Sequence, residues 1–177
     1  MMTDYTSTTT GSRDYEGLCS EDRAAHYRAA NQSVAKRIGD MAENFILKVL
    51  ASKGYNVRKS TAEEDVRLHA DLILDDGVTI DVKNKTKFYL ELQNRWGGKG
   101  WLFTGADYII QMFHDSNYWS QDEIYIYDRR EMVKYYQENS PIFQMKYCEK
   151  MRDGSILWAL GKKRLETMPF VKKIKLS

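Results

Sequence analysis

The residues whose types and spacing could do chemistry lie in a short charged stretch, residues 69–87. Nine residues separate Asp71 from Asp81, and Lys83 follows Asp81 after one intervening residue. An apolar run, the turn-forming residues 75–77 and an alternating run lie in that order, which is the pattern of a β-hairpin. Two carboxylates and an ammonium group held together could bind a hard divalent cation through oxygen and orient water beside it.

The length of the hairpin turn decides whether the two aspartates meet. With a three-residue loop, residues 75–77 with the glycine in a left-handed bulge position, opposed residues are symmetric about Asp76 and Asp71 lies across from Asp81. With a two-residue loop, residues 76–77, Asp71 pairs with Val82 instead and leaves the acidic face. We predict the three-residue loop.

Opposed carboxylates on neighbouring strands destabilise the pairing because like charges repel across the ladder. At a separation of about 4 Å and an effective dielectric constant of about 20, the repulsion is on the order of 4 kcal/mol. A divalent cation would offset that cost, and Lys83 shares a strand face with Asp81 and Lys85. The alternative is a solvated hairpin face whose charges never meet. The wider sequence pattern favours the site.

This arrangement resembles the PD-(D/E)XK nuclease superfamily, in which an acid on one strand and an acid-any-Lys triplet on the next form the metal site. Asp71 and the triplet 81–83 match those positions, and Glu43 lies where an upstream helix often contributes a further acid. The resemblance covers about residues 33–139. It departs from the pattern at Ala70, where the family has proline.

The resemblance implies an α/β fold with a restriction-endonuclease-like core, a central mixed β-sheet flanked by helices, and an N-terminal helical extension. It also implies a bound Mg²⁺, or Mn²⁺ as its substitute. Asp71 and Asp81 would hold the ion, with the backbone carbonyl of Val82 as a further ligand and Glu43 completing the sphere directly or through water. Lys83 would orient or deprotonate the attacking water, or stabilise the pentavalent charge.

The function that follows from the resemblance is that of a Mg²⁺-dependent deoxyribonuclease, an endonuclease acting on duplex or branched DNA. A catalytically silent module that binds nucleic acid or protein on the same fold is the alternative. An exonuclease, a site-specific restriction enzyme and an RNA-directed nuclease stay open. So does a homodimer, for which the sequence identifies no surface.

A glycine-rich stretch after the hairpin combines cations with aromatic rings in residues 95–101. Arg95 and Lys99, with Lys85 on the hairpin, are our predicted nucleic-acid contacts, because cations attract phosphates and rings stack on bases. The alternative is a long hairpin loop in which Trp101 packs into the core, and both descriptions can hold together. Gln93 is a weaker candidate for the site.

Other polar residues have both functional and structural explanations. Asp65 is a fallback metal ligand, and His69 could assist the site or only form a structural hydrogen bond. The trio His114, Asp115 and Asn117 could indicate an HNH-type nuclease, but no second, well-placed histidine supports that. The basic cluster 162–164 fits phosphate contact or protection of a strand edge equally well.

Composition allows one domain over residues 18–177 after a flexible polar tail, residues 1–17. The chain has 177 residues, 42% of them hydrophobic, and its formal charge of +2 is too small to indicate nucleic acid. No run approaches the roughly 20 apolar residues of a membrane span, and the polar start lacks a secretory signal. Two unpaired cysteines predict neither a disulfide framework nor a zinc site. We expect a soluble cytoplasmic protein.

Periodicity and turn residues predict the remaining elements. Helices are expected over 20–30 and 33–53, and another should begin at the Asp128/Glu131 capping pattern, run through Tyr136 and end before Pro141. Residues 61–66 read as an acidic loop. Strands are expected over residues 55–60, 106–113 and 124–127, then around 143–147, 156–160 and 170–176.

Overall fold

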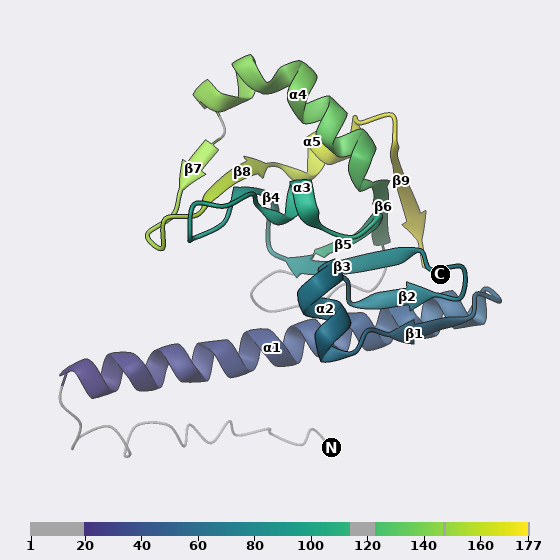
Figure 1. Ribbon diagram of the computed structural model, residues 1–177, viewed down its shortest axis with the longest axis horizontal. Helices are drawn as coiled ribbons and strands as arrows, with labels where there is room; N and C mark the ends of the chain where they lie inside the picture. The colour runs from purple at the N-terminus through teal and green to yellow at the C-terminus, as the bar shows by residue number, and fades with distance from the viewer. Residues whose placement is uncertain (1–19, 114–122, 147, 177) are drawn as a thin grey trace, which may run out of the picture. The chain divides into compact units, whose positions relative to one another are not determined.

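The computed structural model describes residues 20–113, 123–146 and 148–176, with the side chains of 34–140 (apart from 114–122) and 148–176. The chain divides into two compact units, Met1–Ile38 and Gly39–Ser177, and the account below concerns the second (Figure 1). The predicted tail 1–17 and the trio at 114–117 lie outside the described residues. None of the helices in the described part of the chain is long and apolar enough to cross a membrane.

A single helix, α1 (Ser20–Ser52), replaces the two helices expected at the start of the chain. The predicted break at residues 31–32 contains neither glycine nor proline, so the helical hydrogen bonds continue across it. The predicted stop is confirmed, because Gly54 adopts a left-handed conformation with φ of 86°. In the second unit, α1 buries Ala42 and Ile46 against strand residues of the sheet described next.

The larger sheet is mixed, as the sequence predicted. Its strand order is β1-β2-β3-β5-β6-β9, with β3 and β5 parallel and every other neighbouring pair antiparallel. The strands are β1 (Val57–Lys59), β2 (Leu72–Leu74), β3 (Thr79–Lys85), β5 (Tyr108–Phe113), β6 (Glu123–Asp128) and β9 (Val171–Lys175). All six fall within or close to strands expected from the sequence.

A second sheet, in the order β4-β8-β7, lies on the face of the larger sheet opposite to the α1 residues Ala42 and Ile46 (Figure 1). It consists of β4 (Phe88–Gln93), β8 (Ile156–Leu160) and β7 (Cys148–Lys150). Because side chains alternate along a strand, β5 sends Ile110 to the core under α1 and Ile109 to a second core. That second core also contains Trp158 from β8 and Tyr136 from α4 (Arg129–Lys146).

Three expectations about local structure are wrong. The acidic loop at 61–66 is helix α2 (Ala62–Leu68), begun by a capping box in which Thr61 accepts from the Glu64 N–H and Glu64 accepts from the Thr61 N–H. Helix α4 continues past its predicted end, through Pro141 to Lys146, and residues 143–146 are therefore helical where a strand was expected; a proline costs a helix one hydrogen bond but does not always end it.

Two short helices complete the described fold. Helix α3 (Trp101–Thr104) follows the glycine-rich turn, and helix α5 (Lys162–Glu166) contains the basic cluster of the C-terminal region. Gly100 precedes α3 because a Cβ atom there would lie 2.1 Å from the carbonyl oxygen of Glu91. That close approach brings the N-terminus of α3 against β4, beside the hairpin.

Candidate metal and phosphate site

The hairpin has the predicted register. Leu72 pairs with Ile80 and Ile73 with Thr79, so the opposed residues are symmetric about Asp76. The loop is closed by a 2.9 Å hydrogen bond from the Leu74 N–H to the Val78 carbonyl. Gly77 takes a left-handed conformation with φ of 84°, which confirms the three-residue loop with its glycine bulge. The paired residues end at Leu72 and Ile80, and Asp71 and Asp81 are the next residues beyond that pair on their two segments.

The carboxyls of the two aspartates interact, but Asp71 is not a regular ladder partner of Asp81, because its N–H bonds the carbonyl of Ile80, which already opposes Leu72. The Asp71 N–H donates to the Ile80 carbonyl at 2.9 Å, and Asp71 Oδ2 accepts from the Val82 N–H at 2.7 Å. Burial, then the negative charge of Asp81, raise the pKa of Asp71 to about 7, although the Val82 N–H and the charge of Lys83 act in the opposite direction. The carboxyl of Asp71 is therefore partly protonated at neutral pH while no cation is bound.

Lys83 forms an ion pair with Asp81, one of these two aspartates. Its Nζ lies 2.7 Å from Asp81 Oδ2, and the side chain of Asp81 is 4% exposed. Burial alone would lower the pKa of Lys83, but attraction to Asp81, helped by Asp71 and Glu91, raises it above its ordinary value. The Nζ also lies 5.1 Å from the ring centroid of Trp101, within cation–π range. Lys83 is thus held as a charged ammonium group.

These residues open onto a pocket of about 440 Å³. Carboxylates outnumber cations on its walls: the carboxylates belong to Asp65, Asp71, Asp81, Glu91 and Asp153, and the cations to Lys83, Arg95 and Lys99. A phosphate entering such a pocket is repelled unless a further positive charge is present. The composition of the walls therefore favours a bound cation, and an anionic ligand would need such a cation beside it.

The structure brings most of the predicted site residues together. Arg95 and Lys99 are exposed and line the pocket, and Trp101 is half-buried against the second core, as the hairpin-loop description expects; the nucleic-acid contacts stay a prediction. Asp65 and His69 line the pocket as well. The side chain of Val82 is buried in the core under α1, and its N–H contacts Asp71.

Other predicted residues lie outside this pocket. Glu43 does not line it; its Oε2 accepts a hydrogen bond from Lys59 Nζ at 2.9 Å. Over the described ranges, no three His, Cys, Asp or Glu side chains are grouped so that they could hold a metal ion. Lys85 is exposed at the end of β3 but is not part of the wall, and Gln93 pairs with Ile156 in the second sheet.

Among the residues of the pocket wall that sequence reasoning missed, such as Asp153 and Glu91, Glu91 is the one that acts on Lys83. It lies on β4, lines the pocket, acts on Lys83 electrostatically and accepts a 3.3 Å hydrogen bond from the Trp101 N–H. The signal that could have found it is the alternation of residues 88–93, where apolar Phe88, Leu90 and Leu92 leave Glu91 on the opposite face. Its proximity to Lys83 depends on how the second sheet packs.

The donor set fits a divalent cation that shares its coordination with a substrate. Asp81 Oδ2 is buried and, among the residues described, receives no aligned hydrogen bond; it has only the ion pair with Lys83. Two neighbouring carboxylates are the protein ligands that Mg²⁺ commonly takes when water and substrate phosphates supply the rest. A site that is closed by protein ligands alone would need a third acid, which these positions do not provide.

Comparison with known proteins assigns no family. No protein-family model matches the chain, and no curated protein matches it. Among solved structures the chain is similar to a bacterial homing endonuclease, I-Ssp6803I, with a TM-score of 0.40 and 17% identity over 56% of this chain and 72% of that chain. A likeness this slight carries no argument. The fold and the pocket define a mixed α/β protein with an acidic pair and a lysine at one end of a parallel strand pair.

Proposed function

We propose that this protein is a Mg²⁺-dependent deoxyribonuclease, an endonuclease that hydrolyses DNA phosphodiester bonds. The observation that carries the proposal is the convergence of Asp71, Asp81 and Lys83 on one wall of a pocket. Crowded carboxylates raise the free energy of the metal-free protein, and a bound cation relieves that cost. The restriction-endonuclease-like core implied by the sequence resemblance belongs to the same proposal.

The aspartates would hold the ion, with the Val82 carbonyl as a further proposed ligand. A bound Mg²⁺ lowers the pKa of coordinated water and withdraws charge from phosphate oxygens. The Val82 N–H fixes one oxygen of Asp71, which orients the other toward the pocket. We leave Glu43 out of this ligand set, because its carboxylate is bound by Lys59.

Lys83 acts as a cation in this proposal. A group whose pKa is raised above its ordinary value does not serve as a general base near neutral pH. Its ammonium group can donate to a nonbridging phosphate oxygen and stabilise the negative charge that grows during attack by water. Burial among Asp81, Glu91 and the Trp101 ring fixes its position before the substrate arrives.

The proposal is tested by incubating the protein with supercoiled, linear and branched DNA over a Mg²⁺ and Mn²⁺ series. Lys83→Ala and Asp81→Asn should abolish nicking while circular dichroism shows an unchanged fold. Lys134→Ala, an exposed lysine on α4, is the matched control and should cleave as the parent does. Equal cleavage by the Lys83 and Asp81 variants and the parent would refute the proposal.

A binding module without catalysis is the second candidate, and one observation favours it. Lys83 Nζ already contacts Asp81 Oδ2, and the described chain supplies no third acid to complete a closed metal site. Calorimetric titration with Mg²⁺ and Mn²⁺, followed by binding and cleavage assays on the same DNA, separates the two. Binding without nicking at any divalent ion supports the module, and RNA in parallel reactions tests the nucleic acid that is recognised.

A further inference from the structure

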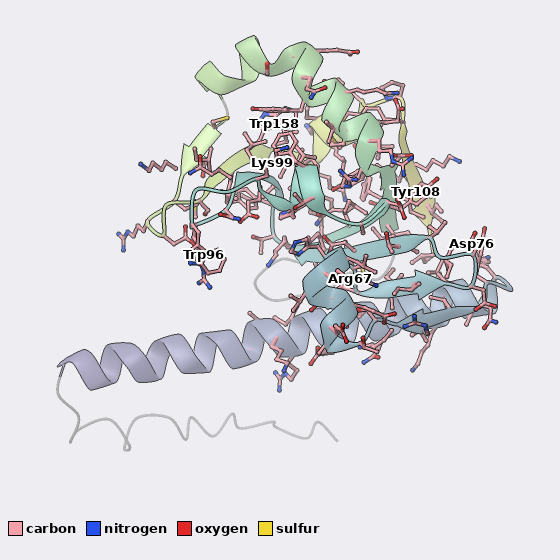
Figure 2. The ribbon with its side chains drawn as sticks, in the orientation of Figure 1. Arg67, Asp76, Trp96, Lys99, Tyr108 and Trp158 are labelled. Carbon is pink, nitrogen blue, oxygen red and sulfur yellow. The ribbon has the colours of Figure 1, made fainter. Side chains whose placement is uncertain are left out.

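A large aromatic side chain stands exposed beside the pocket. Trp96 is 77% exposed, although tryptophan is among the side chains with the most to gain from burial. The guanidinium of Arg95 lies 4.1 Å from the centroid of its ring. Figure 2 labels Trp96 and Lys99, which lie on the same loop after β4. Both line the pocket that also contains Asp71 and Asp81.

The backbone of this loop is closed without help from the indole ring. Asn94 Oδ1 accepts from the Trp96 N–H at 3.1 Å and from the Gly98 N–H at 2.9 Å. Asn94 also exchanges backbone hydrogen bonds with Gly97 and Gly98, each at 3.0 Å. Gly97, with φ of 84°, allows the tight turn. Trp96 is therefore held in place by its backbone, and its ring is left for a ligand.

The second tryptophan on the pocket wall has a different role. The Trp101 ring packs against the second core and lies 5.1 Å from Lys83 Nζ, so it positions the lysine. Trp96 has no such task, since its ring contact is with the neighbouring Arg95. An exposed ring flanked by a cation, on the wall of a pocket of about 440 Å³, has the features of a base-stacking platform.

We infer that Trp96 stacks on an unpaired base next to the phosphate that a cation bound by Asp71 and Asp81 would hold. In a continuous duplex both faces of an internal base already contact neighbouring bases, so the ring gains little there. A base in a single strand, a flap or a branch point offers a free face. The inference rests on the proposed function and names its substrate class: DNA with an unpaired nucleotide beside the scissile phosphate.

Binding is measured in a Lys83→Ala background with Mg²⁺, so that no DNA is cut during the titration. Fluorescence anisotropy reports the affinity for a labelled single strand and for a duplex of the same sequence. Trp96→Ala should weaken single-strand binding about fivefold or more, because stacking on one base contributes at least about a fivefold gain in affinity. Duplex binding should stay within about twofold of the parent. Trp96→Phe keeps a ring and should retain most of the affinity.

Tyr55→Ala removes an exposed aromatic ring that lies outside this pocket, and it should change neither affinity. Unchanged single-strand binding in Trp96→Ala would overturn the inference, and so would an equal loss on single strand and duplex. Cleavage by the chain with Lys83 intact is followed separately. If Trp96→Ala weakens single-strand binding selectively but the chain cleaves no DNA, the nuclease is rejected and the stacking role stands. If the chain cleaves DNA equally well with and without Trp96, the nuclease stands and the stacking role is rejected.

Discussion

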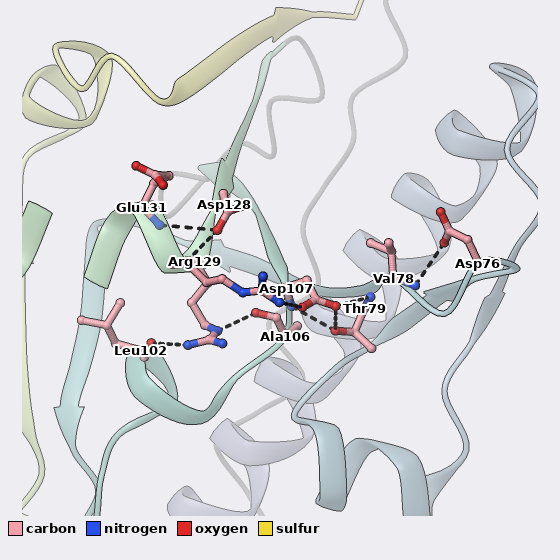
Figure 3. Close-up of polar contacts among 10 residues, drawn as sticks. Asp76, Val78, Thr79, Leu102, Ala106, Asp107, Asp128, Arg129 and Glu131 are labelled. Atoms are coloured by element: carbon pink, nitrogen blue, oxygen red, sulfur yellow. Dashed lines mark hydrogen bonds and ion pairs between the residues drawn. The ribbon is translucent and has the colours of Figure 1, made fainter. Parts of the chain in front are cut away.

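Two aspartates, Asp107 and Asp71, lie close to opposite edges of strand β3, and their surroundings differ in kind. Asp107 Oδ2 accepts from the Thr79 N–H at 3.1 Å and from Thr79 Oγ1 at 2.8 Å, and its own N–H donates to Thr79 Oγ1 at 2.9 Å (Figure 3). Asp107 Oδ1 lies 3.2 Å from Arg130. Every acceptor of this carboxylate therefore has a donor.

The pKa values of the two carboxyls record that difference. Burial acts to raise the pKa of Asp107, but the hydrogen bonds from Thr79 and the charge of Arg130 outweigh it and lower the pKa. At Asp71 burial and the neighbouring Asp81 prevail and raise the pKa to about 7. A carboxylate that the fold itself satisfies is structural. One that the fold leaves crowded needs a proton or a cation, and this marks it as a candidate for function.

Arg129, in the same region as Asp107, also has hydrogen-bond partners within the fold. Its Nε donates to the Ala106 carbonyl at 2.7 Å and its Nη1 to the Leu102 carbonyl at 3.2 Å, which ties α3 and the start of β5 to α4 (Figure 3). Asp128 in turn accepts the Arg130 N–H and begins α4. This region holds β3, β5 and α3 in position and thereby supports the pocket without entering it.

The largest expected difference between the two aspartates is in metal binding. Asp71→Asn should weaken Mg²⁺ binding at least about 100-fold, because it removes one of two carboxylate ligands. Asp107→Asn should leave the affinity within about twofold. Isothermal titration calorimetry on both variants measures this directly. Equal affinities would show that Asp71 is crowded for a reason unrelated to a cation.

A second expected difference concerns the pH dependence of stability in the absence of metal. The pKa of Asp71 is about 7 in the folded chain, against an ordinary value of 3.8, so the folded state binds more protons between those values. The free energy of unfolding should therefore fall as pH rises from about 4 to 7, by about 3 kcal/mol from this group. Asp71→Asn should remove that fall.

Chemical denaturation at several pH values, compared between the parent and Asp71→Asn, isolates the effect from other titrating groups. Saturating Mg²⁺ should also flatten the parent's profile between about pH 4 and 7, since the bound ion replaces the proton on Asp71. Parallel curves for parent and variant across the range would contradict the assignment of the raised pKa to Asp71.

A third expected difference concerns how much each aspartate contributes to the free energy of unfolding. Asp107→Ala should lower the free energy of unfolding by about 2 kcal/mol, because it leaves the Thr79 N–H and hydroxyl without their charged acceptor. Asp71→Ala should cost less than this at pH 8, since removing it also relieves the repulsion with Asp81. Urea denaturation of both variants without metal supplies the comparison, with Asp40→Ala on the exposed face of α1 as the control for a surface aspartate.

The sequence could predict what depends on local geometry. The hairpin register followed from a loop of three residues that ends in a glycine, and with it the proximity of Asp71 and Asp81. The capping box at Thr61 and Glu64 was equally local, and helix α2 was missed because its acids were interpreted as a solvated loop. The place of Glu91 next to Lys83 depends on the packing of a second sheet, and no neighbouring residues encode that distance.

Glu43 gives the smallest expected effect and the clearest contrast with the aspartates. The resemblance implied a helix acid near the metal. Whether a helix residue reaches a site depends on which strand residues lie beside it, and here Glu43 forms an ion pair with Lys59 of β1. An ion pair with side chains 38% and 22% exposed is worth at most about 1 kcal/mol. Glu43→Gln should therefore lower stability by less than that and leave both Mg²⁺ affinity and DNA cleavage unchanged. A loss of either would mean that Glu43 exchanges Lys59 for the metal when substrate binds, and a structure with Mg²⁺ and DNA would then have to show that exchange.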